Sequence, residues 1–199
     1  MSFNYAFALT GGIATGKSTV IEQLKLSGFR IIDADQISHE VIDEQSSKIA
    51  DMFGKEFVKD GKVDRKSLGS VVFVDKVKRK ALESLLHPII YRKIKEKSDK
   101  LDKRGEPYIV DIPLFYENGN YAIANVIVVY TPKEKQIQRL MERDNFTKEE
   151  ALLRIESQLD IEQKRDNALY VIDNSSNLKH LEVEVNRVKE EILGDNLWQ

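Results

Sequence analysis

The chain carries, close to its N-terminus, the run Leu9-Thr10-Gly11-Gly12-Ile13-Ala14-Thr15-Gly16-Lys17-Ser18-Thr19. From Gly11 onward this run reads G-x-x-x-x-G-K-S, the pattern of a phosphate-binding loop. Glycines let the backbone curl so that successive N–H groups point at a phosphate, and a helix that opens near Lys17 adds the positive end of its dipole. We therefore predict that residues 12–19 bind the phosphates of ATP. In this arrangement Lys17 bridges the β- and γ-phosphates, and the Ser18 hydroxyl ligates Mg²⁺.

The sequence on either side of the loop supports this interpretation over a chance glycine-rich turn. The apolar run Tyr5–Leu9 suits a buried parallel strand. Val20, Ile21 and Leu24 follow the loop at helical spacing, and Gly28 is placed as a C-terminal cap. Strand, loop and helix therefore occur in the order that a phosphate-binding loop requires.

The composition limits the classes of protein to be considered. The chain has 199 residues and a formal net charge of −2, which indicates one globular unit with a substantial core and argues against nucleic-acid binding through bulk charge. It contains no cysteine, so it forms no disulfide and no cysteine-based zinc site. No apolar stretch approaches the roughly 20 residues that span a bilayer, and no signal-peptide pattern is visible. We expect a soluble cytoplasmic protein without nucleic-acid, membrane or obligate protein partners.

Short apolar runs alternate with longer amphipathic stretches, which is the pattern of an α/β protein with a parallel sheet. We predict five strands, at 5–10, 29–32, 108–112, 126–130 and 170–173. Helices are predicted at 17–27, within 36–54, and at 67–101, 133–143, 148–164 and 178–192. His87-Pro88 is expected to break the long central helix, and the capping-box spacing of Thr147 and Glu150 predicts a helix start.

We predict a single domain over residues 1–199 with two specialised helical regions. The segment 60–104 contains no credible strand and is therefore expected to be a helical substrate-binding insertion between strands of the sheet. The region 133–165 is expected to be a helical lid. Lysine and arginine outnumber acidic residues in 76–104. That excess either attracts an anionic substrate or is the solvated face of a helix.

Three acidic residues follow predicted strands, at the edge of the sheet where ligands bind in open α/β proteins. Asp33 and Asp35 come after the strand at 29–32, and one of them could accept a proton while the other supports Mg²⁺. The alternative for Asp35 is a helix N-cap. Asp111 ends the strand at 108–112, where it either assists a metal or belongs to the turn before Pro113.

Further runs accompany the loop. In chain order they are Ile32-Asp33-Ala34-Asp35, Phe53-Gly54, Asp60-Gly61, Asp64-Arg65, Leu86-His87-Pro88, Pro113-Leu114-Phe115-Tyr116-Glu117, Arg139, Arg143-Asp144, Gln158 and Val171-Ile172-Asp173-Asn174. In this order and spacing they resemble the dephospho-CoA kinase family over nearly the whole chain. The resemblance implies a three-layer P-loop kinase fold with a five-stranded parallel sheet. It also implies transfer of the ATP γ-phosphate to the ribose 3′-hydroxyl of dephospho-CoA, with Mg²⁺.

The resemblance also implies roles for individual residues. Asp35 matches the base proposed in the family. The implied substrate contacts are Asp33, Asp35, Arg65, His87, Pro113, Leu114 and Glu117. His87 has a packing role at a helix junction as its alternative. Arg139 and Arg143, one helical turn apart, resemble lid arginines that close over the ATP phosphates, and the alternative for both is a solvated helix face.

The departures from the family pattern are mild. Ala14 and Thr15 stand where the family usually has Gly and Ser, a change that is tolerated if residue 14 keeps a negative φ. Leu169 stands where Asp is common, so a polar role there is in doubt. Asp111 is not part of the family pattern.

Three other functions compete with this interpretation. Another small-molecule P-loop kinase would share the loop but not the runs at 33–35 and 113–117. A guanine-nucleotide switch would be expected to carry N-K-x-D after a late strand, and this tetrapeptide does not occur. A nucleic-acid kinase is disfavoured by the net charge and by the lack of a basic stacking surface rich in aromatic residues.

Overall fold

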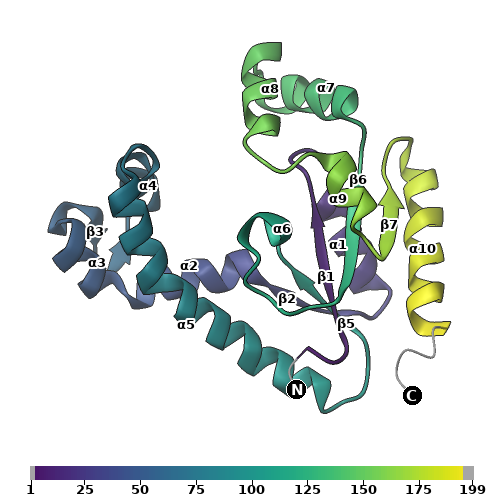
Figure 1. The fold of residues 1–199 in the computed structure, drawn as a ribbon, viewed down its shortest axis with the longest axis horizontal. Helices are drawn as coiled ribbons and strands as arrows, with labels where there is room; N and C mark the ends of the chain where they lie inside the picture. The colour runs from purple at the N-terminus through teal and green to yellow at the C-terminus, as the bar shows by residue number, and fades with distance from the viewer. Residues whose placement is uncertain (1–2, 195–199) are drawn as a thin grey trace. The chain divides into compact units, whose positions relative to one another are not determined.

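The computed structural model describes residues 3–194 and divides into two compact units (Figure 1). The first unit comprises Met1–Ile32 and Ser98–Gln199, and the second comprises Asp33–Lys97. The second unit thus begins and ends earlier in the chain than the insertion expected at 60–104. No helix among the described residues is both long enough and apolar enough to cross a membrane.

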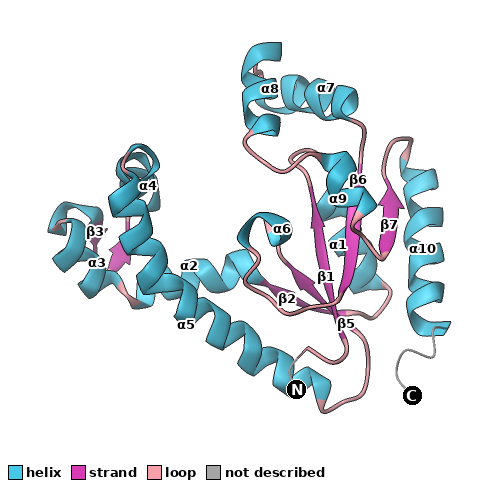
Figure 2. Ribbon diagram, viewed as in Figure 1, coloured by secondary structure: helices cyan, strands magenta, loops and turns pink. Residues whose placement is uncertain are grey.

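The first unit is built on a five-stranded parallel sheet, which confirms the predicted fold class (Figure 2). Its strands are β1 (Ala6–Gly11), β2 (Arg30–Asp33), β5 (Tyr108–Asp111), β6 (Asn125–Tyr130) and β7 (Tyr170–Asp173). Their order across the sheet is β2-β5-β1-β6-β7. The central strand β1 pairs with β5 and β6, placing Leu9 between Asp111 and Ile127. The carboxyl end of β1, where the loop begins, therefore lies in the middle of the edge at which such sheets bind ligands.

Helices surround this sheet and form most of the second unit. They are α1 (Lys17–Leu26), α2 (Ala34–Glu44), α3 (Ser46–Phe53), α4 (Arg65–Val74), α5 (Lys76–Asp102), α6 (Phe115–Asn118), α7 (Lys133–Asp144), α8 (Lys148–Glu156), α9 (Ile161–Asp166) and α10 (Leu178–Gly194). The predicted helices at 17–27, 133–143 and 178–192 match α1, α7 and α10 closely. The capping box at the start of α8 is confirmed, because the side chains of Thr147 and Glu150 each accept the other's backbone N–H.

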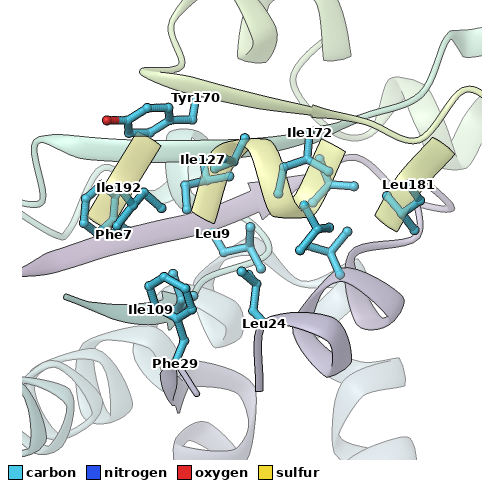
Figure 3. Packing of buried hydrophobic residues seen from close by; sticks show 14 residues of the cluster. Phe7, Leu9, Leu24, Phe29, Ile109, Ile127, Tyr170, Ile172, Leu181 and Ile192 are labelled. Atoms are coloured by element: carbon cyan, nitrogen blue, oxygen red, sulfur yellow. The ribbon is translucent and has the colours of Figure 1, made fainter. Parts of the chain in front are cut away.

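The core of the first unit lies between one face of the sheet and helices α1 and α10 (Figure 3). Leu9 and Ile127 from the central strands are fully buried, as are Leu24 of α1 and Leu181 of α10. Burying a side chain of this size contributes roughly 1.5–3 kcal/mol. The packing thereby fixes β1 and α1, the two elements that flank the loop.

The predicted break at His87-Pro88 is wrong, because α5 runs through Pro88 without interruption. Proline removes one backbone N–H and crowds the preceding turn, which disfavours a helix interior. Here the 27-residue helix has buried side chains on both sides of the proline, Leu86 and Ile90. Tertiary burial of these neighbours outweighs the loss of one hydrogen bond.

The single helix predicted at 148–164 is two helices, α8 and α9. The chain leaves α8 at Ser157, and Asp160 then caps α9 by accepting the N–H of Glu162 at 2.8 Å. The sequence did not predict this cap, because the apolar residues continue at helical spacing and an Asp also fits the solvated face of a continuous helix. The interruption places Gln158 and Leu159 outside either helix.

The second unit has its own small core, formed by the buried side chains of Ile49, Val63 and Leu68. The prediction that 60–104 contains no strand is wrong. Val58–Lys59 (β3) pairs antiparallel with Lys62–Val63 (β4). The intervening Asp60-Gly61 turn has positive φ at both residues, which is the backbone twist that two-residue hairpin turns favour.

A polar network joins α10 to the edge strand β7. Arg187 donates through Nη2 to Val171 O at 2.7 Å and to Glu184 Oε2 at 2.8 Å, and the same carboxylate accepts the N–H of Asp173. Arg187 is the main cause that lowers the pKa of Glu184 below its ordinary value of 4.5. The contact between Arg187 and the Glu184 carboxylate therefore stabilises the fold fully above about pH 4.5. This stabilisation is lost as the pH falls through the lowered pKa that Glu184 has in the folded protein.

We expect Glu184→Gln to lower the free energy of unfolding at pH 7 by about 0.5–1 kcal/mol, because a charge-assisted, half-exposed contact is lost. Urea unfolding at pH 7 and pH 3 checks this, and the difference from the parent protein should shrink at pH 3. Glu190→Gln, which changes a highly exposed carboxylate on the same helix, serves as the control. An equal effect of both variants at pH 7 would contradict the assigned role of the network.

Candidate active site

The loop between β1 and α1 has the backbone of an anion-binding site. Gly16 is the N-cap of α1, with φ of 87°, and no side chain caps the helix there. The N–H groups that open a helix have no partner inside it, so they are available to an anion. Lys17 and Ser18 start α1 directly after this residue. The structure therefore places these predicted phosphate contacts at the end of the central strand.

The backbone of Ala14 does not have the negative φ expected for an alanine that replaces the usual glycine of the family pattern. It was expected to be tolerated with a negative φ, but its φ is 60°. This left-handed conformation costs an L-residue roughly 1–2 kcal/mol, which glycine would avoid. The surrounding contacts hold it there: Ala14 O accepts from Arg139 at 3.2 Å, and the side chain packs against the α7–α8 cluster formed by Leu140, Ala151 and Ile155.

Side chains from distant parts of the chain bind the carbonyl groups of the loop. Lys164 donates to Gly11 O at 2.9 Å, and Asn174 Nδ2 donates to Thr15 O at 2.8 Å. Thr131 Oγ1 also reaches Thr15 O, at 3.2 Å. Because these carbonyls are engaged behind the loop, its N–H groups can be directed toward a ligand.

Lys17 forms an ion pair with Asp111, with Nζ 2.5 Å from Oδ1. The Asp111 side chain is only 7% exposed and ends β5, the strand beside β1. Its carboxylate therefore pairs with Lys17, so Asp111 does not merely belong to the turn before Pro113. Pro113 itself contributes a carbonyl that accepts from Thr10 Oγ1 at 2.8 Å.

The two predicted lid arginines differ in their surroundings. Arg139 reaches Ala14 O and Thr15 O through Nη1 and Asn174 O through Nη2, so its guanidinium supports the loop. Arg143 is exposed and makes a two-pronged contact with Asp144, at 2.9 and 2.7 Å. This contact raises the pKa of Arg143 and lowers that of Asp144. Arg139 is therefore tied to the loop, whereas Arg143 stays on the exposed face of α7, where Asp144 is its partner.

A cavity of about 980 Å³ opens beside the loop. Its lining includes Gly16 and Thr19 from the loop and first turn of α1, Arg143 from α7, and Asn177 and Leu178 at the start of α10. This volume and the mixture of apolar and polar groups suit a ligand of nucleotide size. All of the lining residues belong to the first unit.

Glu117 pairs with Lys164, which contacts the loop, and Gln158 binds the loop directly. Glu117 Oε1 lies 2.7 Å from Lys164 Nζ and accepts the N–H of Leu159 at 3.0 Å. Gln158 Oε1 accepts the N–H of Ile13 at 2.9 Å. Leu114, from the same run as Glu117, precedes α6 and is partly exposed.

The remaining predicted site residues lie in the second unit. Asp33 caps α2 by accepting the N–H of Gln36 at 2.8 Å, so the cap expected as an alternative for Asp35 is made by Asp33. Asp35 sits in the first turn of α2 with an exposed side chain, and its carboxylate bonds to no other residue in the described part of the chain. A carboxylate with this freedom can accept a proton or a substrate hydroxyl.

Arg65 and His87 also belong to this second unit. Arg65 begins α4 and lies 3.5 Å from Asp43, with about half of its side chain exposed. His87 lies on α5 and is exposed, so the packing role considered for it is wrong. Both side chains remain accessible to a ligand.

Several supporting residues were not predicted as site residues. Gln158 and Asn174 were part of the family pattern, which was the available signal for them, although no contact was assigned. Lys164 and Thr131 had no such signal. A lysine inside the charged run Ile161–Asp166 reads as a surface residue, and only the fold reveals its burial.

Mg²⁺ was expected on Ser18. No group of three or more His, Asp or Glu side chains suitable for a metal occurs in the described residues. A magnesium ion that is held chiefly by substrate phosphates and water needs only one or two protein oxygens. The Ser18 position at the start of α1 therefore fits such an ion.

Gly16→Ala should damage the loop through both its φ and its surroundings. A Cβ at residue 16 would lie 2.1 Å from Asn174 Nδ2, the group that holds Thr15 O. We expect the unfolding free energy to fall by about 1–3 kcal/mol, with a clear loss of ATP affinity. Thermal unfolding and ATP titration check this. Gly69→Ala, at a helical glycine with open space around it, is the matched control. Unchanged ATP affinity in Gly16→Ala would contradict the role of the loop.

A parallel sheet, a glycine-rich loop at its central strand and a lysine that opens the following helix define a P-loop nucleotide-binding protein. Comparisons with known proteins identify the family within this class. The sequence profile of the dephospho-CoA kinase family matches residues 5–180. The chain belongs to the dephospho-CoA kinase family.

Individual relatives agree with this assignment. A dephospho-CoA kinase from Sulfurimonas denitrificans is 51% identical over 192 residues, covering 96% of both chains. One from Helicobacter pylori is 44% identical over 196 residues, covering 97% of this chain and all of the relative. The solved dephospho-CoA kinase from Campylobacter jejuni has a TM-score of 0.71 at 39% identity, covering 94% of this chain and 97% of its own.

A more distant structure shows how widely the fold is shared. Shikimate kinase from Acinetobacter baumannii has a TM-score of 0.50 at 18% identity, covering 96% of this chain and 94% of its own. This likeness concerns the fold alone. Together with the closer relatives it confirms the P-loop kinase architecture.

Proposed function

We propose that this protein is a dephospho-CoA kinase, which transfers the γ-phosphate of ATP to the ribose 3′-hydroxyl of dephospho-CoA in the final step of coenzyme A biosynthesis. The observation that carries the proposal is the preformed phosphate-binding loop with Lys17, in a chain that belongs to this family.

The loop positions the ATP phosphates in the proposed reaction. Within residues 12–19, the backbone N–H groups other than those of Ile13, Thr15 and Thr19, which already have partners, bind the β- and γ-phosphates. Lys17 neutralises charge that develops between these phosphates. Asp111, in contact with Lys17, keeps its ammonium directed. When bound, Mg²⁺ would be held by Ser18 and would neutralise charge on the same phosphates.

Asp35 acts as the general base. Its carboxylate accepts the proton of the 3′-hydroxyl as that oxygen bonds to the γ-phosphorus. The bond from the γ-phosphorus to the bridging oxygen breaks, and ADP leaves with the electron pair. Asp33 fixes the start of α2 and thereby the position of Asp35.

The nucleoside of ATP occupies the 980 Å³ cavity beside the loop. Two observations support this placement: Gly16 and Thr19 contribute to the cavity wall, and all of the lining belongs to one unit. Leu178 offers an apolar surface for a base, and Asn177 offers polar groups for its edge.

The second unit, with the basic residues of α5, would bind dephospho-CoA. Exposed Arg65 and His87 are the side chains we assign to this substrate. Pro113 and Leu114 are also proposed as contacts of dephospho-CoA. A substrate contact by Glu117 stays a prediction, as do the cytoplasmic location and the absence of nucleic-acid or obligate protein partners.

The lid is assigned to residues 133–165, with Arg143 as the side chain that contacts the phosphates. We expect Arg143→Ala to lower kcat/KM for ATP about 10-fold or more, because a charge-assisted hydrogen bond is lost. Steady-state kinetics with varied ATP check this. Arg154→Ala, an exposed arginine on α8 that stacks on Phe146, provides the control. Unchanged kinetics in Arg143→Ala would reject its lid role.

The test of the proposed function is ADP release from Mg-ATP with and without dephospho-CoA. We expect strong release only when dephospho-CoA is present, with CoA as the second product, and no such release by a Lys17→Ala protein. Slow release that is indifferent to dephospho-CoA would reject the proposal.

A further inference from the structure

Lys164 is a fully buried lysine on α9 whose ammonium contacts the carbonyl group of Gly11. We propose that Lys164, held by Glu117, is a positioning residue that sets the direction of the first peptide group of the phosphate-binding loop. The inference rests on the proposed function, because it concerns the binding of ATP by that loop. It adds a pair of residues that do not themselves touch the nucleotide.

The contacts of Lys164 link three separate parts of the chain. Its Nζ donates to Gly11 O at 2.9 Å and lies 2.7 Å from Glu117 Oε1. That carboxylate oxygen also accepts the N–H of Leu159, in the turn between α8 and α9. Glu117, which is itself held by the N–H of Leu159, therefore fixes the ammonium on one side, and Gly11 O is its second partner.

Because the peptide bond is planar, the contact of Lys164 with Gly11 O also determines where the N–H of Gly12 points. In a trans peptide the C=O of one residue and the N–H of the next point to opposite sides. Holding Gly11 O toward Lys164 thus turns the N–H of Gly12 away from Lys164. Gly12 is the first residue of the predicted phosphate cradle. Lys164 thereby orients a donor for the phosphates without contacting them.

The other end of the loop is built in the same way, which supports this interpretation. Asn174 Nδ2 holds Thr15 O, so the N–H of Gly16 faces the opposite side of that peptide. Gly16 lines the nucleotide-sized cavity. Between these two points, Gln158 accepts the N–H of Ile13 and so removes it from the set that could bind phosphate.

The cost of burying Lys164 indicates that the contact is specific. An ammonium removed from water is strongly destabilising unless it is paired, and apolar residues of similar size often replace a buried ion pair without loss of stability. The pair formed with Glu117 offsets the burial. Stability alone does not call for a lysine here, whereas a donor directed at Gly11 O does.

The test separates the two roles by comparing three variants: Lys164→Met, Glu117→Gln and the double variant. Mg-ATP binding is measured by calorimetry without acceptor, and unfolding is measured in urea. Lys164→Met should weaken ATP binding about 10-fold or more, because small displacements of a binding group are costly. Glu117→Gln should weaken it less, since Lys164 still donates to Gly11 O. Lys189→Met, which changes a lysine on α10 paired with Glu190, is the matched control and should bind ATP normally.

The double variant is decisive. It removes both charges, so its stability should recover relative to Lys164→Met, while ATP binding should remain weak because Gly11 O has lost its donor. Recovery of ATP affinity together with stability would overturn the inference, and so would normal affinity in folded Lys164→Met. If Lys164→Met does not fold, the double variant alone gives the same decision. Failure of the parent protein to release ADP with dephospho-CoA would reject the acceptor, and the calorimetry would still test Lys164.

Discussion

Asp35→Asn is expected to lower kcat about 10²-fold or more, because a positioned general base contributes 10²–10⁴-fold. Asparagine keeps the size of the side chain and can still accept a hydrogen bond, but it cannot take the proton of the attacking hydroxyl. Asp35 is exposed in the first turn of α2 and bonds to no other described residue, so the fold should be little affected. Steady-state kinetics with ATP and dephospho-CoA give the measurement.

The pH dependence distinguishes a base from a residue that only contacts substrate. Loss of the base should remove the acidic limb of the kcat/KM profile, whereas loss of a contact should raise KM and leave the profile in place. Asp51→Asn, on α3 of the same unit and also exposed, is the matched control. Turnover equal to that of the parent protein would remove Asp35 from the mechanism.

The second large effect is expected at Lys17. Lys17→Met should lower kcat/KM for ATP about 10²–10³-fold, the effect of removing one preorganised charge stabiliser from a transition state. It also leaves the carboxylate of Asp111, which is only 7% exposed, without its cationic partner. Part of the loss could therefore come from repulsion between that carboxylate and the ATP phosphates.

The double variant Lys17→Met with Asp111→Asn separates these two causes. If Lys17 stabilises the phosphates directly, removing the Asp111 charge should restore ATP binding in part but not turnover. Full recovery of turnover would contradict the catalytic role of Lys17. Lys25→Met, at the exposed end of the same helix, is the control and should behave as the parent protein.

Local patterns predicted the sheet and the loop, because short-range chemistry determines both. The apolar runs predicted all five strands of the sheet, and the spacing from Gly11 to Ser18 predicted the loop that joins β1 to α1. The capping box at Thr147 was likewise visible, since its two partners are three residues apart. In each case the deciding interactions lie within a few residues of one another or repeat along an element.

The errors arose where distant contacts decide the structure. Pro88 stays inside α5 because buried neighbours hold both adjoining turns. Ala14 adopts a positive φ because Arg139 and the α7–α8 cluster constrain it. Lys164 is buried through partners 47 and 153 residues away in sequence, Glu117 and Gly11. No local pattern could have revealed these partners.

The engaged carbonyls of the loop have a consequence for the energetics of nucleotide capture. Since side chains from α7, α9 and the segment after β7 already fix the loop, its ordering entropy is lost when the chain folds and not when ATP arrives. The association rate of ATP should then approach that of a ligand binding to a rigid receptor, without a slow adjustment of the loop. A substitution that loosens the loop would transfer this entropic cost to the binding step, and saturating ATP would restore much of the lost thermal stability.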